Sequence, residues 1–316
     1  MQLNHKINIA GIVIDIYVDR RFNNIEKFIN NFKTLNINNR NVTAIIYISK
    51  GIKRKVELSR DWSTLSITGD KIDNLTDPFN LIGITQAIFR FAAIHLAKRG
   101  VFLLHGSAAA LDSNRIICFG DDGSSTAKTL GSLEIVFKTN RYVADEFCFI
   151  NIKTCKIFGY PFIPIHIRPV VRKHLETCHN LTLPTTNYKK LDAGDFIQPT
   201  ELFRVISGKL KMLLYVHFSE TKNVLENLSQ KKACKAFKFC VASHIAKLLN
   251  PKLDRMQFVF KTDSIAAKVI SENTINDIIE KIFDHQSILE AIQKFPSYKL
   301  TISQPCQIVS LLKTEI

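Results

Sequence analysis

The feature that constrains this chain most is a segment in which an apolar run passes directly into a polar, glycine-containing loop. Residues 115–119 (RIICF) form the run, the loop begins at Gly120, and residues 128–138 read as a helix. Two further strand-like runs follow at 141–144 and 147–150. A strand, a glycine-containing turn, a helix and a strand in this order are typical of the βαβ unit that binds mononucleotides. We therefore expect an α/β core built around this segment.

The loop is an irregular version of the phosphate-binding P-loop, G-x-x-x-x-G-K-[ST]. In that motif backbone N–H groups surround the phosphates, the lysine reaches the β- and γ-phosphates, and the hydroxyl group holds Mg²⁺. Counting forward from Gly120 and Gly123 places Thr126 at the lysine position, which would make the loop inactive. Counting back from Lys128 and Thr129 supplies both functional groups, but the loop is then two residues longer than the motif.

The flanking residues resemble the catalytic core of the HPr kinase/phosphorylase-like proteins, which share a fold with PEP carboxykinase. The pair His105-Gly106 precedes Gly120 with the spacing of that family, and Ala144-Asp145-Glu146 stands where the family has Ala-Asp-Asp. Counting back from this second motif places the family's lysine and hydroxyl on Lys128-Thr129. We therefore prefer that register, with the additional residues inside the loop.

The resemblance implies a role for each matching residue. Lys128 would neutralise phosphate charge, and Thr129 would ligate Mg²⁺. Asp145 would act as general base toward a substrate hydroxyl, Glu146 would help to hold Mg²⁺, and His105 would line the active site. Two adjacent carboxylates beside a phosphate loop repel each other, which is a physical reason to expect a metal. The predicted nucleotide-binding residues are Gly120, Gly123, Ser124, Ser125, Thr126, Ala127, Lys128 and Thr129.

Each of these residues also has a plainer interpretation. Lys128 could be an exposed lysine at a helix start, and Asp145 with Glu146 a capping or turn pair. His105 follows a short apolar run at 101–104, so it could be a structural histidine at the end of a strand. These alternatives stay open on the sequence alone.

Three features of the loop argue against tight phosphate binding. Asp121 and Asp122 oppose an anion electrostatically. The HPr kinase loop tolerates one aspartate at the place of Asp121, with its side chain turned outward. Ala127 replaces the glycine before the lysine, and its Cβ would crowd the phosphate. These features support a second hypothesis, a catalytically inactive pseudokinase that binds a nucleotide or a partner, although the lysine, hydroxyl and base are all retained.

The composition indicates which classes of binding partner to expect. The formal net charge of the 316 residues is +15, which favours anionic partners. A Lys-, Asn- and Ile-rich composition can produce the same charge without a polyanion. The chain has no RNA-binding aromatic signature and no zinc-finger spacing, so nucleic acid is not the partner we expect. An acidic peptide or a phosphorylated metabolite suits the charge better.

Cysteine usage and hydropathy predict a cytoplasmic protein that does not span a membrane. The seven cysteines show no CxxC pair, and no secretory signal opens the chain. The most apolar stretch, Leu81–Ala97, contains Gln86, Arg90 and His95, so we expect a buried helix rather than a membrane span.

The expected organisation is an N-terminal α+β portion over residues 1–78 and an HPr kinase-like P-loop domain over residues 79–316, with Asp77-Pro78 as the break. The N-terminal portion does not resemble that of HPr kinases, so HPr is not the substrate we expect. The resemblance implies an ATP- and Mg²⁺-dependent kinase that phosphorylates a hydroxyl group of a peptide serine or a small molecule. It also implies a homo-oligomer, since HPr kinases assemble as hexamers.

Overall fold

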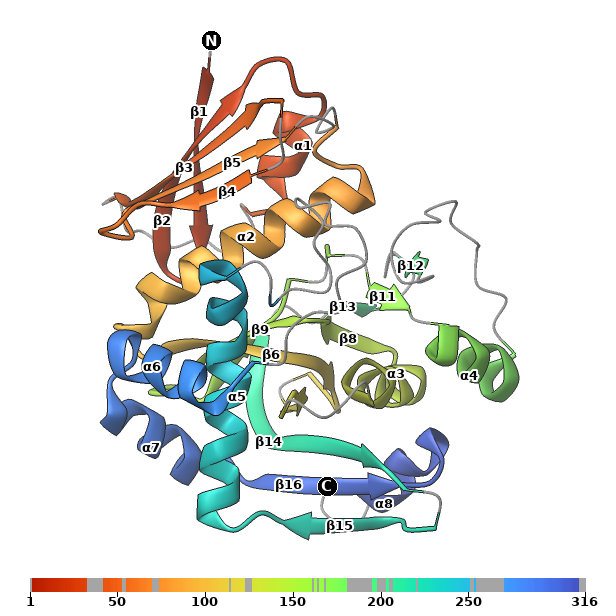
Figure 1. Ribbon diagram of the computed structural model, residues 1–316. Helices are drawn as coiled ribbons and strands as arrows, with labels where there is room; N and C mark the ends of the chain where they lie inside the picture. The colour runs from red at the N-terminus through yellow and green to blue at the C-terminus, as the bar shows by residue number, and fades with distance from the viewer. Residues whose placement is uncertain are drawn as a thin grey trace. The chain divides into compact units, whose positions relative to one another are not determined.

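The chain is a mixed α/β protein whose sheets combine parallel and antiparallel strands (Figure 1). It forms two compact units, Met1–Val101 with His244–Ile282 and Phe102–Ser243 with Phe283–Ile316. The boundary expected after residue 78 falls inside the first unit, and it stays a prediction. The computed structural model describes residues 2–32, 42–52, 55–69, 74–113, 115–122, 127–160, 162–163, 165–167, 169–180, 195–197, 203–204, 207–219, 221–250, 253 and 270–312.

The first unit contains a five-stranded sheet in the order β1-β2-β3-β5-β4. Strands β2, β3 and β5 run parallel, and antiparallel β1 and β4 form the edges. The alternation of apolar residues over 6–18 predicts strands with a bend at Gly11, and Gly11 has a φ of 104° in the turn between β1 and β2. The strands are β1 (Gln2–Ile9), β2 (Ile12–Asp19), β3 (Val42–Lys50), β4 (Lys55–Leu58) and β5 (Thr64–Gly69).

Two helices supply most of the remaining core of the first unit. Phe28 of α1 (Ile25–Asn30) packs edge to face on Phe32, which follows the helix, and Phe32 meets Phe89 of α2 (Pro78–Ala97) in the same way. By length and composition, the window Asn80–Ala97 in α2 could cross a membrane. However, 89% of this window is buried inside the protein, as in the core helix of a folded domain. The unit also contains α6 (Glu272–Ile282).

The second unit is built on a nine-stranded sheet. Its main path runs β13-β8-β6-β9-β10-β14-β16-β15, and β7 pairs with both β6 and β14. The strands are β6 (Val101–Ala110), β7 (Arg115–Gly120), β8 (Arg141–Ala144), β9 (Phe147–Asn151), β10 (Lys156–Phe158), β13 (Phe203–Arg204), β14 (Ser207–Phe218), β15 (Val224–Asn227) and β16 (Ser297–Ile302). A separate pair is formed by β11 (Ile165–Ile167) and β12 (Asp195–Ile197).

Five helices and a short 3-10 turn accompany these strands, and helix α5 crosses the boundary between the two units at residues 243 and 244. Helix α3 packs on β7, β8 and β14. The helices are α3 (Ala127–Thr139), α4 (Pro169–His179), α5 (Gln230–Leu249), α7 (His285–Lys294) and α8 (Ile308–Leu312), and the 3-10 turn η2 covers Pro305–Gln307.

The arrangement of β7, α3 and β8 matters most for function. Both strands pair antiparallel with β6, so they run parallel to each other with β6 between them. Their carboxyl ends therefore lie at the same edge of the sheet. The register places Gly106 opposite Gly120 and Ala108 opposite Ala144. One strand thus carries His105 past the ends of both neighbours.

Strand β6 and helix α3 both pack closely against Phe119. A Cβ on Gly106 would lie 2.7 Å from the carbonyl oxygen of Phe119, and a Cβ on Gly131 would lie 2.7 Å from its ring. Both approaches are closer than real side chains tolerate. Glycine at these two positions lets the strand and the helix touch the same residue from different sides.

Most predicted elements are found close to their expected bounds. The strand at 141–144 matches β8, and the helix at 128–138 is α3. The hydrophobic pattern also predicts strands at 55–58 and 256–260 and a helix over residues 22–35. The first strand matches β4 and the second lies outside the described residues, while α1 covers Ile25–Asn30 of the predicted helix.

One prediction was wrong. The apolar run at 101–104 was expected to end before His105, but strand β6 continues to Ala110 and His105 lies in its middle. The small residues from Gly106 to Ala110 are buried throughout, and a strand covered on both faces shows no alternation of polar and apolar residues that would mark its length.

Candidate functional site

The structure brings together side chains from three neighbouring strands and the first turn of α3. His105 comes from the middle of β6, and Asp121 follows the end of β7. Lys128 is the second residue of α3, and Asp145-Glu146 follows the end of β8. These five side chains, with Thr129, form what we call the Lys128 cluster. They converge because β7 and β8 end at the same edge of the sheet.

Lys128 is the cationic centre of this cluster. Its side chain is buried, and its Nζ lies 3.2 Å from Glu146 Oε1 and 3.5 Å from Asp121 Oδ2. Burial by itself lowers the pKa of Lys128, but the carboxylates of Glu146, Asp121 and Asp145 outweigh it and raise the pKa. The lysine is therefore held in its charged form inside the protein.

Asp145 is more deeply buried than its neighbour Glu146 and binds the first turn of α3. The hydroxyl of Thr129 donates to Asp145 Oδ1 at 2.9 Å. Burial and the charge of Glu146 raise the pKa of Asp145 to about 6, while Lys128 and the Thr129 hydrogen bond act in the opposite direction. Asp145 therefore exchanges its proton close to neutral pH.

The turn after β8 separates the two carboxylates. Glu146 has a φ of 66°, a left-handed conformation that non-glycine residues rarely adopt, and Phe147 N donates to the carbonyl oxygen of Asp145 at 2.8 Å. This backbone geometry directs Asp145 to Thr129 and Glu146 to Lys128 and His105. Strain of this kind is common at functional sites.

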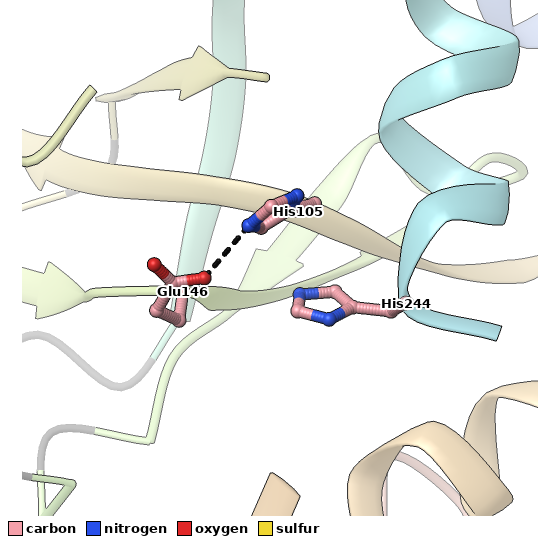
Figure 2. Close-up of side chains that lie close together, drawn as sticks. All are labelled: His105, Glu146 and His244. Carbon is pink, nitrogen blue, oxygen red and sulfur yellow. Dashed lines mark ion pairs between the residues drawn. The ribbon is translucent and has the colours of Figure 1, made fainter. Parts of the chain in front are cut away.

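His105 links the carboxylates on either side of it. Its Nδ1 lies 3.0 Å from Asp121 Oδ2, and its Nε2 lies 2.8 Å from Glu146 Oε2, the pair that Figure 2 marks with a dashed line. Nε2 is also within hydrogen-bonding distance of Lys128 Nζ. Ser243 Oγ of α5 lies 3.2 Å from Nδ1, so the ring is held from several sides.

The charges of the cluster do not balance. Among the described residues, the carboxylates of Asp121, Asp145 and Glu146 surround Lys128 and His105. Both ring nitrogens of His105 face carboxylate oxygens, so the ring can carry a charge, and even then three negative groups face two positive groups. Carboxylate and hydroxyl oxygens are the ligands that Mg²⁺ prefers. Thr129, Asp145 and Glu146 supply oxygens of this kind, and a cation bound among them would reduce the imbalance.

The position of Asp121 corrects an expectation. The resemblance implied a side chain turned outward, but Asp121 points into the cluster toward His105 and Lys128. The reason is that a cationic lysine and an imidazole lie within reach. The neighbouring Asp122 pairs with His217 Nε2 at 2.9 Å, so His217 has a partner that its sequence position did not reveal.

The remaining predicted loop residues divide into two groups. Gly120 is the last residue of β7. A Cβ at this position would lie 2.8 Å from the ring of Tyr215, so close packing explains why a glycine stands here. Ala127 is the first residue of α3. The other predicted phosphate-binding residues, Gly123, Ser124, Ser125 and Thr126, lie outside the described residues.

Sequence reasoning missed several supporting side chains. Ser107 forms a hydrogen bond with Ser132 and also donates to the carbonyl oxygen of Ala144 at 3.3 Å, which connects β6, α3 and β8 beneath the cluster. Cys240 of α5 donates to the carbonyl oxygen of His105. No motif marks these residues, because their partners are distant in the sequence.

No protein-family model matches the chain, and no curated protein matches it. The interpretation of the Lys128 cluster therefore depends on its own geometry and chemistry.

Proposed function

We propose that this protein is an ATP- and Mg²⁺-dependent kinase that transfers the γ-phosphoryl group to a hydroxyl group of a peptide serine or a small molecule. The observation that carries the proposal is the Thr129–Asp145 hydrogen bond at the start of α3, beside the buried Lys128. A lysine, a hydroxyl and a carboxylate in this arrangement are the groups that phosphoryl transfer requires. The P-loop core of the HPr kinase-like proteins is the finer fold that we propose.

The start of α3 supports phosphate binding. The first N–H groups of a helix have no partner within the helix, and its dipole makes this end positive. Lys128 adds a full positive charge in the first turn of this 13-residue helix. Phosphate groups placed here would meet both contributions.

Asp145 suits the role of general base. Its pKa of about 6 is close to neutral pH, so most of the carboxylate is ionised at pH 7 and still able to take up a proton. In the proposed reaction the acceptor oxygen attacks the γ-phosphorus, the bond to the β–γ bridging oxygen breaks, and ADP leaves. The acceptor proton passes to Asp145, while Lys128 stabilises the charge on the phosphate oxygens.

Thr129 and Glu146 would hold the magnesium ion, with Asp145 beside them. When bound, Mg²⁺ neutralises charge on the β- and γ-phosphate oxygens. Thr129 would offer its oxygen to the metal while it continues to donate its proton to Asp145. The same hydrogen bond would then orient both the metal ligand and the base.

A second candidate function is supported by one observation. Asp121 and Glu146 both lie at Lys128 Nζ, where phosphate oxygens would bind. To reach Lys128, the phosphates of a nucleotide must displace these carboxylates or neutralise their charge. If the carboxylates stay in place, the protein would bind a nucleotide or a partner but would not transfer a phosphoryl group. The second candidate is therefore a pseudokinase that acts as a nucleotide- or partner-binding module.

Calorimetric titration of ATP with Mg²⁺ tests the site, with Lys128→Ala and the control Lys138→Ala. Lys138 is exposed near the other end of the same helix. We expect micromolar binding to the parent and to Lys138→Ala, and no measurable binding to Lys128→Ala. Absence of binding to the parent at millimolar ATP would overturn both nucleotide-binding proposals.

Transfer is then separated from binding with Asp145→Asn. Release of ADP is measured with candidate acidic peptides and small alcohols as acceptors. We expect Asp145→Asn to bind ATP and to lose turnover by a factor of roughly 10² to 10⁴, the usual contribution of a general base. If the parent binds ATP but transfers to no acceptor, the pseudokinase is the better account.

A further inference from the structure

A second cluster of titratable side chains lies on the same helix as Lys128 but is made of different residues. Glu134 of α3 is buried, and its Oε1 lies 2.6 Å from His174 Nε2 and 2.8 Å from His179 Nε2. Both histidines belong to α4, His174 at its middle and His179 at its last residue. We call these three residues the Glu134 cluster. It shares no residue with the proposed kinase site.

The three ligand atoms of this cluster converge on one point. The carboxylate oxygen and the two imidazole nitrogens all lie within 4.8 Å of one another. Two imidazole nitrogens and one carboxylate oxygen form a donor set that binds Zn²⁺, with a fourth position left for water or another ligand. Nitrogen donors of this kind do not favour Mg²⁺, which prefers an all-oxygen environment.

The separations allow a metal after a small movement. Bonds of about 2 Å to a tetrahedral Zn²⁺ place neighbouring ligand atoms roughly 3.3 Å apart. The present 2.6 and 2.8 Å distances are those of hydrogen bonds, in which both Nε2 atoms donate to a single oxygen. Loss of these two protons leaves two lone pairs facing the carboxylate, and a cation between them would remove their repulsion.

Neighbouring side chains orient the two rings. Cys178 Sγ lies 3.6 Å from His174 Nδ1, and Phe137 stacks on His179 with ring centroids 4.5 Å apart. In the metal-bound state the proton of His174 would sit on Nδ1, where the sulfur of Cys178 can accept it. His179 is partly exposed and Cys178 is exposed, so an ion can reach the cluster from solvent.

We propose that Glu134, His174 and His179 form a binding site for Zn²⁺ or a similar divalent transition metal. The ion would join the C-terminal end of α4 to α3, the helix that begins beside Lys128. Since His174 and His179 lie 40 and 45 residues after Glu134, the metal would cross-link two segments that are distant in the sequence.

Titration of Zn²⁺ into the full chain, freed of metal with a chelator, tests the proposal by calorimetry. We expect one ion per chain with micromolar or tighter affinity. The double variant His174→Ala/His179→Ala should lose at least about 100-fold in affinity, because loss of outer partners alone costs 10- to 100-fold. The matched control His285→Ala, an exposed histidine of α7, should bind like the parent.

Two further measurements protect the test against a variant that fails to fold. Glu134→Gln keeps the shape and an accepting oxygen, and we expect it to lose the rise in Tm that Zn²⁺ produces in the parent. Cobalt added to the unmodified parent should give the visible absorption of tetrahedral Co²⁺, which Zn²⁺ then removes. No zinc binding, or equal binding to the parent and the double variant, overturns the proposal, as does an unaltered Tm rise in Glu134→Gln.

Discussion

The two clusters on helix α3 differ in how their charges balance. In the Lys128 cluster at the first turn, three carboxylates face a lysine and a histidine, and the prospective ligands are oxygens. In the Glu134 cluster one carboxylate faces two histidines, and two of its three prospective ligands are nitrogens. If both proposals hold, one helix presents two sites with opposite metal preferences, because oxygen donors favour Mg²⁺ and imidazoles favour Zn²⁺.

The largest effect on stability should come from removing the central cation. Lys128→Met leaves the carboxylates of Asp121, Asp145 and Glu146 without their cation, and we expect a loss of about 3–5 kcal/mol, as for other broken buried ion pairs. Urea unfolding at pH 7 measures it. Lys138→Met, exposed on the same helix, is the control. Equal stability of the two variants would show that the lysine does not hold the cluster together.

A packing change in α3 should affect both clusters at once. Gly131→Ala places a Cβ 2.7 Å from the Phe119 ring, and we expect a loss of about 1–3 kcal/mol from overpacking. Displacement of α3 should also weaken binding of both ATP and Zn²⁺. Thermal unfolding and the two titrations measure this. If only one ligand is affected, the two clusters do not depend on a common position of the helix.

Removal of the proposed base should stabilise the protein in a pH-dependent way. The pKa of Asp145 is about 6 in the folded protein and near 3.8 when unfolded, so the folded state binds the proton more tightly. Stability therefore falls as pH rises from 4 to 6 and is constant above that range. We expect Asp145→Asn to be more stable than the parent by about 1–3 kcal/mol at pH 7.

The same difference should vanish near pH 4, where Asp145 is protonated in the parent. Urea unfolding at both pH values measures it, with the exposed Asp277→Asn of α6 as the control. A loss of stability in Asp145→Asn at pH 7 would mean that the bonds from Thr129 and Lys128 outweigh the cost of burying the charge.

The smallest effect on stability is expected in the Glu134 cluster. Glu134→Gln keeps an oxygen that accepts from His174 or His179, and we expect a loss of only about 1 kcal/mol in the absence of metal, typical of one hydrogen bond. Chemical unfolding in the presence of a chelator measures it. A loss as large as that of Lys128→Met would show that the Glu134 charge is itself essential to the contact between α3 and α4.

Prediction from the sequence worked where local patterns are strong. Strand β8 has its predicted bounds, and α3 begins one residue before the expected start. Lys128 and Asp145 were singled out by the spacing of motifs, and the structure places both in one cluster. In these segments the hydrophobic period and the turn residues are local properties of the sequence, so the elements can be predicted without knowledge of the rest of the fold.

Prediction failed where burial or distance removed the signal. The length of β6 was missed because the strand is covered on both faces and its small residues carry no period. Asp121 was expected to face outward, and its partner His105 lies on another strand. The Glu134 cluster was not found at all, because no spacing in the sequence relates Glu134 to histidines 40 and 45 residues away.

The sequence by itself determined the α/β class and the order of most strands and helices, and it singled out the residues that we propose to contact phosphate and Mg²⁺. Only the tertiary structure decided that β6 lies between β7 and β8, and this placement carries His105 into contact with Asp121, Lys128 and Glu146. The physical reason is that local propensity acts within a few residues. Pairing of strands and burial of charges, by contrast, depend on which distant segments the packed core brings together.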